Sequence, residues 1–251
     1  MLELPLDHTD HTYSRPRPPQ ATFEGKHLRF LLDAALSAAL QQLSRAHGAT
    51  LFMTLLALFQ ALLHTYSGQD DLCVATSIAG RSRTEFEGLV GFFINRLILR
   101  ARVAKGETFS SFLKHVRETT LAGYAHQDVP FDSIVDALGF TTHPSLSPLC
   151  QSMFVLQNMP RSNIRLDGID VEVLEIETGT SKFDLALVIS EVPGGLTGLL
   201  EYKTHLFDEV SMAALAQRFE RLARAVVRDP ELLLSQLSAL DEQEFRSKVA
   251  T

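Results

Sequence analysis

The stretch His126-Gln127-Asp128 places an imidazole, an amide and a carboxylate side by side in the run AHQDVPFDSIVDALG. Imidazole and carboxylate groups are the commonest general acids and bases in enzymes, so this cluster is a candidate for proton transfer. The alternative is a joint between two helices. Pro130 suits the start of a helix because it lacks an N–H group, and it favours extended geometry at Val129. We interpret the cluster as a joint, in which the three side chains end one helix and bond its free carbonyl groups and the free N–H groups of the next helix.

The rest of the chain offers no other catalytic pattern. None of the nine histidines is followed four residues later by an aspartate, the spacing with which His-x-x-x-Asp acyltransferases orient the imidazole. The sequence has no G-x-S-x-G elbow, no phosphate-binding glycine loop and no His/Cys cluster with zinc spacing. The run HTDH at 8–11 has no partner cluster. We therefore predict no catalytic residue and no metal site in this chain.

Composition excludes several classes of protein. The 251 residues carry a formal net charge of −7 and no run of five basic residues, which argues against nucleic acid as a partner. The longest apolar stretch, LFMTLLALFQALL, is too short to span a bilayer, so we expect no membrane segment. Cys73 and Cys150 lie far apart in apolar stretches and are expected to be reduced core thiols. With no signal-peptide pattern at the start, these features predict a cytoplasmic protein.

Periodicity predicts an α/β fold, a two-layer sandwich of helices on a mixed β-sheet. Residues 1–22, rich in proline and polar groups, are expected to form an extended arm. Amphipathic or fully apolar patterns predict helices at 33–48, 50–68, 108–124 and 208–228, with Asp33 and Thr50 as caps of the first two. Strand patterns occur at 71–80, 92–103, 149–159, 169–178, 183–192 and 196–207, and the PGG between the last two favours a tight hairpin.

Five stretches in order resemble condensation domains of nonribosomal peptide synthetases. They are YSGQDDLCVATSIAGRSRTEFEGLVGFFINRLILR, AHQDVPFDSIVDALG, HPSLSPLCQSMFVLQN, TSKFDLALVISE and LEYKTHLFDE. The resemblance implies a fold like chloramphenicol acetyltransferase, used twice in that family as two lobes. This chain resembles the C-terminal lobe only. We expect an arm at 1–22, the lobe at 23–240 and an exit linker at 241–251.

The family resemblance also implies an activity. In such domains a carrier-bound acceptor amine attacks a carrier-bound donor thioester to form a peptide bond, and the catalytic His-His-x-x-x-Asp-Gly belongs to the N-terminal lobe. That motif has no match here, so the lobe is expected to be inactive alone and to supply one wall of the substrate tunnel. The residues predicted to line the tunnel are Phe93, Asn95, Arg96 and Gln151.

Two departures from the family's patterns bear on this prediction. Arg96 stands where threonine is usual, and it either meets a carboxylate or phosphate in the tunnel or is a solvated strand residue. Thr142 and Leu146 replace the two arginines of the family's R-D-P-S-R-S-P-L-F-Q pattern. Asp184, in the SKFDL stretch, is expected to be structural, like the His126 joint. Replacing His126 is therefore predicted to affect folding, and replacing Asn95 to affect rate.

The implied partners are the N-terminal lobe, the donor and acceptor carrier protein domains, and neighbouring synthetase domains. No cofactor is expected to bind directly, because the phosphopantetheine arms of the carriers arrive as part of the substrates. An alternative remains open: a noncatalytic condensation-like module that recruits a carrier protein or a tailoring enzyme. A free-standing acetyltransferase fits poorly, because the chain lacks the histidine pair, and an epimerisation or cyclisation domain fits less well than condensation.

Overall fold

A computed structural model of the chain describes residues 4, 22–81, 84–86, 88–139, 149–157 and 178–237. Most of the predicted arm, including the HTDH run, lies outside the described residues, as do the exit linker and positions Thr142 and Leu146. The strand predicted at 169–178 also lies outside them, apart from its last residue.

Six strands form one mixed sheet in the order β1-β6-β5-β4-β2-β3. β4 is parallel to both of its neighbours, β2 and β5, whereas the other three pairings are antiparallel. The strands β2 to β6 fall within the segments predicted from sequence patterns, apart from the start of β6 one residue earlier. Their bounds are Gly25–Asp33 (β1), Asp71–Ile78 (β2), Asn95–Arg102 (β3), Ser152–Gln157 (β4), Leu185–Val192 (β5) and Gly195–Lys203 (β6).

Strand β1 was not predicted. Its sequence, GKHLRFLLD, mixes charged and apolar residues without clean alternation. The strand forms because it pairs along its whole length with β6, from Gly25 opposite Lys203 to Asp33 opposite Gly195. Strand propensity depends strongly on such cross-strand packing, which local sequence does not contain.

The helices α1 (Ala34–Ala46), α2 (Leu51–Ser67), α3 (Phe109–Ala125) and α5 (Glu209–Arg228) match the predicted segments, and the short α4 (Phe131–Ala137) follows α3. The predicted caps are confirmed: Asp33 accepts a hydrogen bond from the N–H of Leu36, and Thr50 accepts one from the N–H of Met53. Side-chain acceptors at these positions satisfy N–H groups that lack a partner inside the helix.

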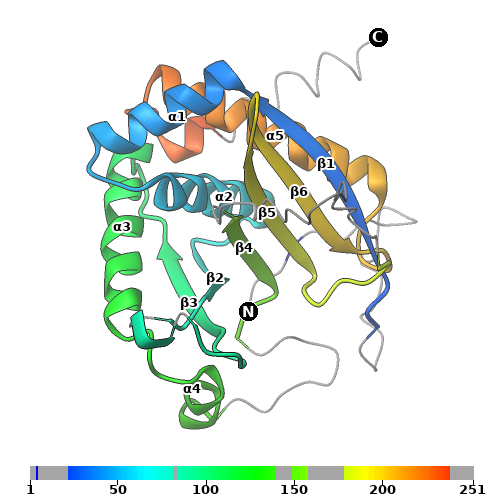
Figure 1. Cartoon of the computed structure of the whole chain (residues 1–251). Coiled ribbons are helices and arrows are strands. Elements are labelled where there is room, and N and C mark those ends of the chain that lie inside the picture. Colours follow the sequence, from blue (N-terminus) through cyan, green and yellow to red (C-terminus); the bar gives the residue numbers. More distant parts are fainter. Residues whose placement is uncertain are drawn as a thin grey trace, which may run out of the picture.

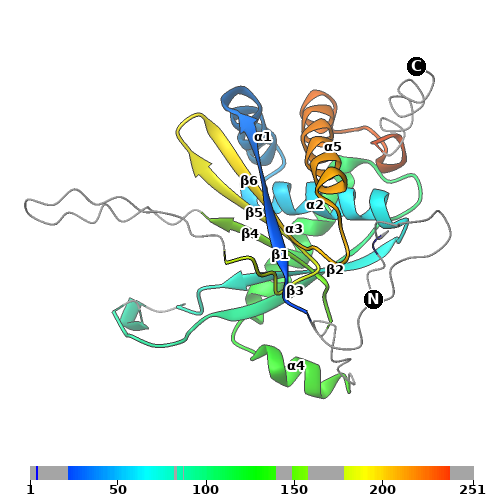
Figure 2. The ribbon, with the colours of Figure 1, turned by 90° about the vertical axis from the view of Figure 1, so that its right-hand side faces the viewer.

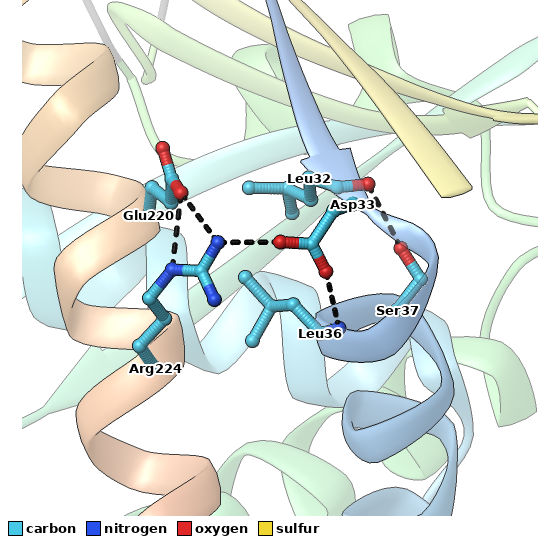
Figure 3. A network of polar contacts seen from close by, with 6 residues as sticks. All are labelled: Leu32, Asp33, Leu36, Ser37, Glu220 and Arg224. Carbon is cyan, nitrogen blue, oxygen red and sulfur yellow. Dashed lines mark hydrogen bonds and ion pairs between the residues drawn. The ribbon is translucent and has the colours of Figure 1, made fainter. Parts of the chain in front are cut away.

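Asp33 also connects two helices that are far apart in sequence. Its second carboxylate oxygen accepts a hydrogen bond of 2.6 Å from Arg224 of α5, and Arg224 also pairs with Glu220 one turn earlier (Figure 3). The hydrogen bonds from Leu36 and Arg224 lower the pKa of Asp33 below its usual value. The start of α1 is therefore fixed to the exposed face of α5.

Helices α1, α2 and α5 lie on one face of the sheet (Figures 1 and 2). The main core lies between these helices, α3 and the sheet, and α2 is buried through most of its length, as its lack of a polar face predicted. A smaller cluster packs on the other face of the sheet around Ala75, Cys150, Phe183 and Ala186. The predicted fold class, helices on a mixed sheet, is confirmed.

Within the described residues, no single helix is long and apolar enough to cross a membrane. The consecutive helices α1 and α2 would reach that length and composition together, but they are bent by 103° relative to each other.

Candidate functional site

The joint between α3 and α4 is held by a side chain from β3. The carboxamide of Asn95 donates hydrogen bonds to the carbonyl oxygens of Gln127, at 2.9 Å, and Val129, at 2.8 Å. Its oxygen accepts a hydrogen bond of 3.2 Å from the N–H of Phe131, the first residue of α4. One amide therefore satisfies two carbonyl groups after α3 and one N–H group at the start of α4.

The side chains of His126, Gln127 and Asp128 do not hold the joint between α3 and α4. His126 is the C-cap of α3 through its backbone. Pro130 is the N-cap of α4, whereas it was predicted to be the first residue of the helix, so α4 begins one residue later than predicted. The side chains of His126 and Asp128 are exposed and make no hydrogen bond or ion pair within the described part of the chain. The expectation that these side chains tie the helices together is corrected: Asn95 supplies the contacts, and the backbone supplies the rest.

Arg96, the neighbour of Asn95, lies between two aromatic rings. Its guanidinium is 4.7 Å from the ring centre of Phe131 in α4 and 5.0 Å from that of Phe183, just before β5. Burial lowers the pKa of the guanidinium below its usual range, and the charge of Asp132 partly opposes that shift. Arg96 was predicted to be either a ligand contact or a solvated strand residue. It is half-buried and stacked between two aromatic rings, and the cation–π contacts stabilise its charged side chain.

Phe93 belongs to the connection between β2 and β3 rather than to a strand. The predicted strand started at Phe92, but β3 begins at Asn95, opposite the last residue of β2. Arg81 stacks on the ring of Phe93 at 4.3 Å and donates hydrogen bonds to the carbonyl oxygens of Phe86 and Leu89. A side chain at Gly80 would clash with the Phe93 carbonyl, which explains the glycine at that turn.

The connection between β2 and β3 exposes a set of large apolar side chains. Phe92 has 89% of its surface exposed and Val90 is fully exposed. Leu89 and Ile94 have at least half of their surface exposed. Soluble monomers seldom leave several large apolar residues of one short segment in water, so such a segment indicates a surface that another protein covers.

Gln151 and Asp184 are buried. The carbonyl oxygen of Gln151 accepts a hydrogen bond of 3.0 Å from the N–H of Asp184. The Asp184 carboxylate forms an ion pair of 3.2 Å with Lys203 of β6, and both side chains are almost fully buried. The pair links the residue just before β5 to the last residue of β6.

A pocket of about 190 Å³ opens where the sheet splits between β2 and β4. These two parallel strands pair only at Val74–Ser152 and Ala75–Met153, and beyond this point β2 pairs only with β3 and β4 only with β5. The lining residues are Phe52, Thr76, Ser77, Ile78, Tyr124, Val155 and Leu156. Sequence analysis did not identify them, because the pocket results from strand pairing and no local motif marks it.

The pocket suits binding better than proton transfer. Among the described residues, its lining has no carboxylate and no imidazole. Burial raises the pKa of Tyr124, so this phenol stays neutral and can donate a hydrogen bond at neutral pH. Two of its strand residues, Ser77 and Ile78, pair in register with Arg96 and Asn95. The predicted tunnel residues of β3 therefore lie in the strand beside the pocket, whereas Gln151 precedes β4.

A mixed six-stranded sheet with this helical layer is the fold of condensation domains. The chain matches holo-AB3403, a four-domain nonribosomal peptide synthetase bound to AMP and glycine, with a TM-score of 0.81 and 24% identity over 93% of this chain and 18% of that one. It matches the X-domain from teicoplanin biosynthesis with a TM-score of 0.79 and 25% identity, over 93% of this chain and 52% of that one.

Sequence comparison gives the family. The Condensation domain model matches residues 1–247. A linear gramicidin synthase protein of Brevibacillus parabrevis is 43% identical over 246 residues, 97% of this chain and 5% of that protein. Tyrocidine synthase 3 of the same organism is 39% identical over 98% of this chain and 4% of that protein. The chain belongs to the condensation-domain family of nonribosomal peptide synthetases. It spans about a twentieth of these curated relatives.

Proposed function

We propose that this chain is the C-terminal lobe of a condensation domain and forms one wall of its substrate tunnel. In the tunnel, the amine of a carrier-bound acceptor attacks the thioester of a carrier-bound donor and a peptide bond forms. The observation that carries the proposal is length: 93% of this chain matches 52% of the X-domain chain. The lobe occupies residues 23–240, between linkers at 1–22 and 241–251.

The proposed contribution of the lobe is positioning. No His-x-x-x-Asp pair exists in the sequence, so the proton transfer belongs to the N-terminal lobe and this chain is inactive alone. Holding two reactants in a productive geometry can itself supply much of a rate enhancement. The phosphopantetheine arms of two carrier domains are the substrates, and neighbouring synthetase domains deliver them in the cytoplasm. The pocket beside β3 and the stacked Arg96 are the features that would contact those arms or their cargo.

The exposed segment 89–94 supports a contact with the N-terminal lobe. Its large apolar side chains are solvated in this chain, and covering them would contribute favourable burial energy on association. Phe92 offers the largest such surface, with 89% exposure. Aromatic residues of this kind often dominate the free energy of binding at an interface.

This interface can be tested by measuring complex formation with a separately produced N-terminal lobe. We expect a 1:1 complex in sedimentation velocity, and we expect Phe92→Asp to weaken it by about tenfold or more. Val210→Asp is the matched control, since Val210 is 82% exposed at the start of α5, away from this segment. Equal binding by the wild-type and Phe92→Asp chains would place the interface elsewhere. No complex at all would contradict the two-lobe proposal.

A second candidate function is a noncatalytic module that recruits another protein. It is favoured by one comparison: the complex of the X-domain and OxyB from teicoplanin biosynthesis matches with a TM-score of 0.81 and 24% identity. The sequence relatives, which are synthases at 39% and 43% identity, favour condensation. Peptide formation in a reconstituted domain separates the two, because a recruiting module would bind its partner and form no peptide.

A further inference from the structure

The two cysteines of the chain meet on the face of the sheet opposite the helices. Cys73 lies in β2, and Cys150 lies just before β4, the strand beside β2. Cys73 packs against the small core cluster that contains Cys150 and Phe183. Both are free thiols. From sequence we expected two separate core thiols, because 76 positions of the chain lie between them, whereas the β2–β4 pairing brings the two segments together.

The two thiols have different surroundings. Cys150 is 1% exposed, whereas Cys73 is only partly buried and can be reached from solvent. Arg100 lies opposite Cys73 in the β2–β3 register. Its guanidinium also donates a hydrogen bond to the carboxylate of Asp71. The neighbouring Cys150 side chain and the Arg100 charge lower the pKa of Cys73 to about 7, although burial opposes this shift. The contact with Cys73 and burial raise the pKa of Cys150, and Arg96 partly opposes that rise.

This asymmetry matches the chemistry of reactive cysteine pairs. The thiolate is the nucleophile, and a thiol whose pKa lies near the ambient pH reacts fastest with oxidants and disulfides. A partly exposed thiolate next to a buried thiol gives one residue that attacks and a second that completes a disulfide. A pair of inert core thiols would instead be equally buried and protonated.

We propose that Cys73 and Cys150 form a peroxide-reactive dithiol site that closes to a disulfide between β2 and the segment before β4. The Cys73 thiolate attacks one oxygen of hydrogen peroxide, the O–O bond breaks, and the released hydroxide takes up a proton to become water. The resulting sulfenic acid of Cys73 is then attacked by the sulfur of Cys150, whose proton leaves with the hydroxyl group as a second water. The two sulfur atoms supply the two electrons that reduce the peroxide.

The disulfide would form at one end of a very short ladder. β2 and β4 pair at Val74–Ser152 and Ala75–Met153, one position after Cys73 and two positions after Cys150, and then separate around the pocket. A covalent link at this position holds together the two strands that border the pocket. It also restricts the unfolded chain, since it closes a long loop between Cys73 and Cys150.

Intact-mass measurement of the reduced chain after stoichiometric peroxide tests the proposal. We expect a mass loss of two hydrogen atoms, no remaining free thiol, a monomer, and a linked pair of peptides containing Cys73 and Cys150 after non-reducing digestion. The Cys73→Ser/Cys150→Ser double variant is the control, because it reports methionine oxidation alone. Intermolecular dimers, or two thiols that remain free and unlinked, would overturn the proposal.

Single variants assign the two roles. In Cys150→Ser, we expect peroxide to leave a sulfenic acid on Cys73 that dimedone traps. In Cys73→Ser, the buried Cys150 should stay unmodified. In the wild-type chain, iodoacetamide should modify Cys73 on the order of tenfold faster than Cys150. Equal alkylation rates in the folded wild-type chain, a measurement that needs no variant, would contradict the assigned roles.

Discussion

The side-chain amide of Asn95 in β3 donates a 2.8 Å hydrogen bond to the carbonyl oxygen of Val129, the residue between α3 and α4. Together with the contacts to Gln127 and Phe131, this bond makes Asn95 the side chain that fixes α4 to the sheet. An alanine at this position leaves two carbonyl groups and one N–H group without their protein partner. The expectation from sequence that Asn95→Ala would affect rate and spare stability is therefore corrected: stability should fall as well.

We predict that Asn95→Ala lowers the free energy of unfolding by about 1.5–4.5 kcal/mol, since each of the three lost hydrogen bonds contributes about 0.5–1.5 kcal/mol. Urea unfolding followed by circular dichroism measures this loss. Hydrogen exchange should also speed up in α4 more than in α2, because the Asn95 hydrogen bonds hold α4 and none of them reaches α2. Unchanged stability of the variant would show that water replaces the amide at no cost.

His126→Ala is the matched comparison for Asn95→Ala. The His126 side chain is exposed and makes no hydrogen bond within the described residues. Exposed substitutions of this kind usually change stability by less than about 0.5 kcal/mol. We expect a melting temperature close to that of the wild-type chain, and a large decrease would reinstate the histidine as a structural element of the joint.

We predict that substitutions of the buried pair Asp184 and Lys203 have strongly non-additive effects on the free energy of unfolding. Lys203→Met removes the cation of this buried pair, and removing one partner of a buried ion pair typically costs about 3–5 kcal/mol. The double variant Asp184→Leu/Lys203→Met removes both charges and should be more stable than Lys203→Met alone. A double-mutant cycle in urea measures the coupling. Additive effects of the two changes would mean that the ion pair contributes nothing beyond its separate side chains.

The contribution of Arg96 to stability should depend on its planar guanidinium rather than on its charge alone. Arg96→Lys keeps the charge but loses the stacking on Phe131 and Phe183, so we expect destabilisation by about 0.5–2 kcal/mol. Arg96→Thr, which restores the residue usual in the family pattern, should lose a similar amount. Thermal melts of both variants test this. A lysine variant as stable as the wild type would indicate that charge alone matters.

Asp71 predicts a specific dependence of stability on pH. The hydrogen bond from Arg100 is the main cause that lowers the pKa of Asp71 from 3.8 to about 2. The folded-state pKa is depressed, so the carboxylate stabilises the fold above about pH 4, and this contribution is lost as the pH falls towards about 2. Asp71→Asn should melt below the wild type at pH 7 and converge with it near pH 2. The same difference at both pH values would contradict the assigned pKa.

Sequence patterns predicted the helices well because their signals are local. The apolar α2, its Thr50 cap and the amphipathic α5 could each be identified from a short window. Strand β1 could not, because its pairing partner β6 lies about 170 residues away in the chain. The pocket at the β2–β4 split could not be predicted for the same reason, since the register of Val74 with Ser152 depends on tertiary structure.

The candidate site shows the same limit. A histidine, an amide and an acid in a row correctly indicated a joint between helices, but the residue that holds it comes from a strand more than 30 positions earlier. Likewise, the substitution at Arg96 was visible in the sequence, whereas the two rings that enclose it come from α4 and from the residue before β5. Residue types suggested which positions mattered, and packing decided what each one contacts.

We propose that this chain is the C-terminal half of a peptide-forming domain, and we therefore expect it to supply positioning and no catalytic histidine. The most direct test is a single-turnover assay with donor-loaded and acceptor-loaded carrier proteins, comparing this chain alone, the N-terminal lobe alone and the two combined. We predict peptide only in the combined sample, and its loss when the motif histidine of the N-terminal lobe is replaced by alanine. Peptide formed by this chain alone, or no peptide from a verified two-lobe complex, would contradict this division of roles.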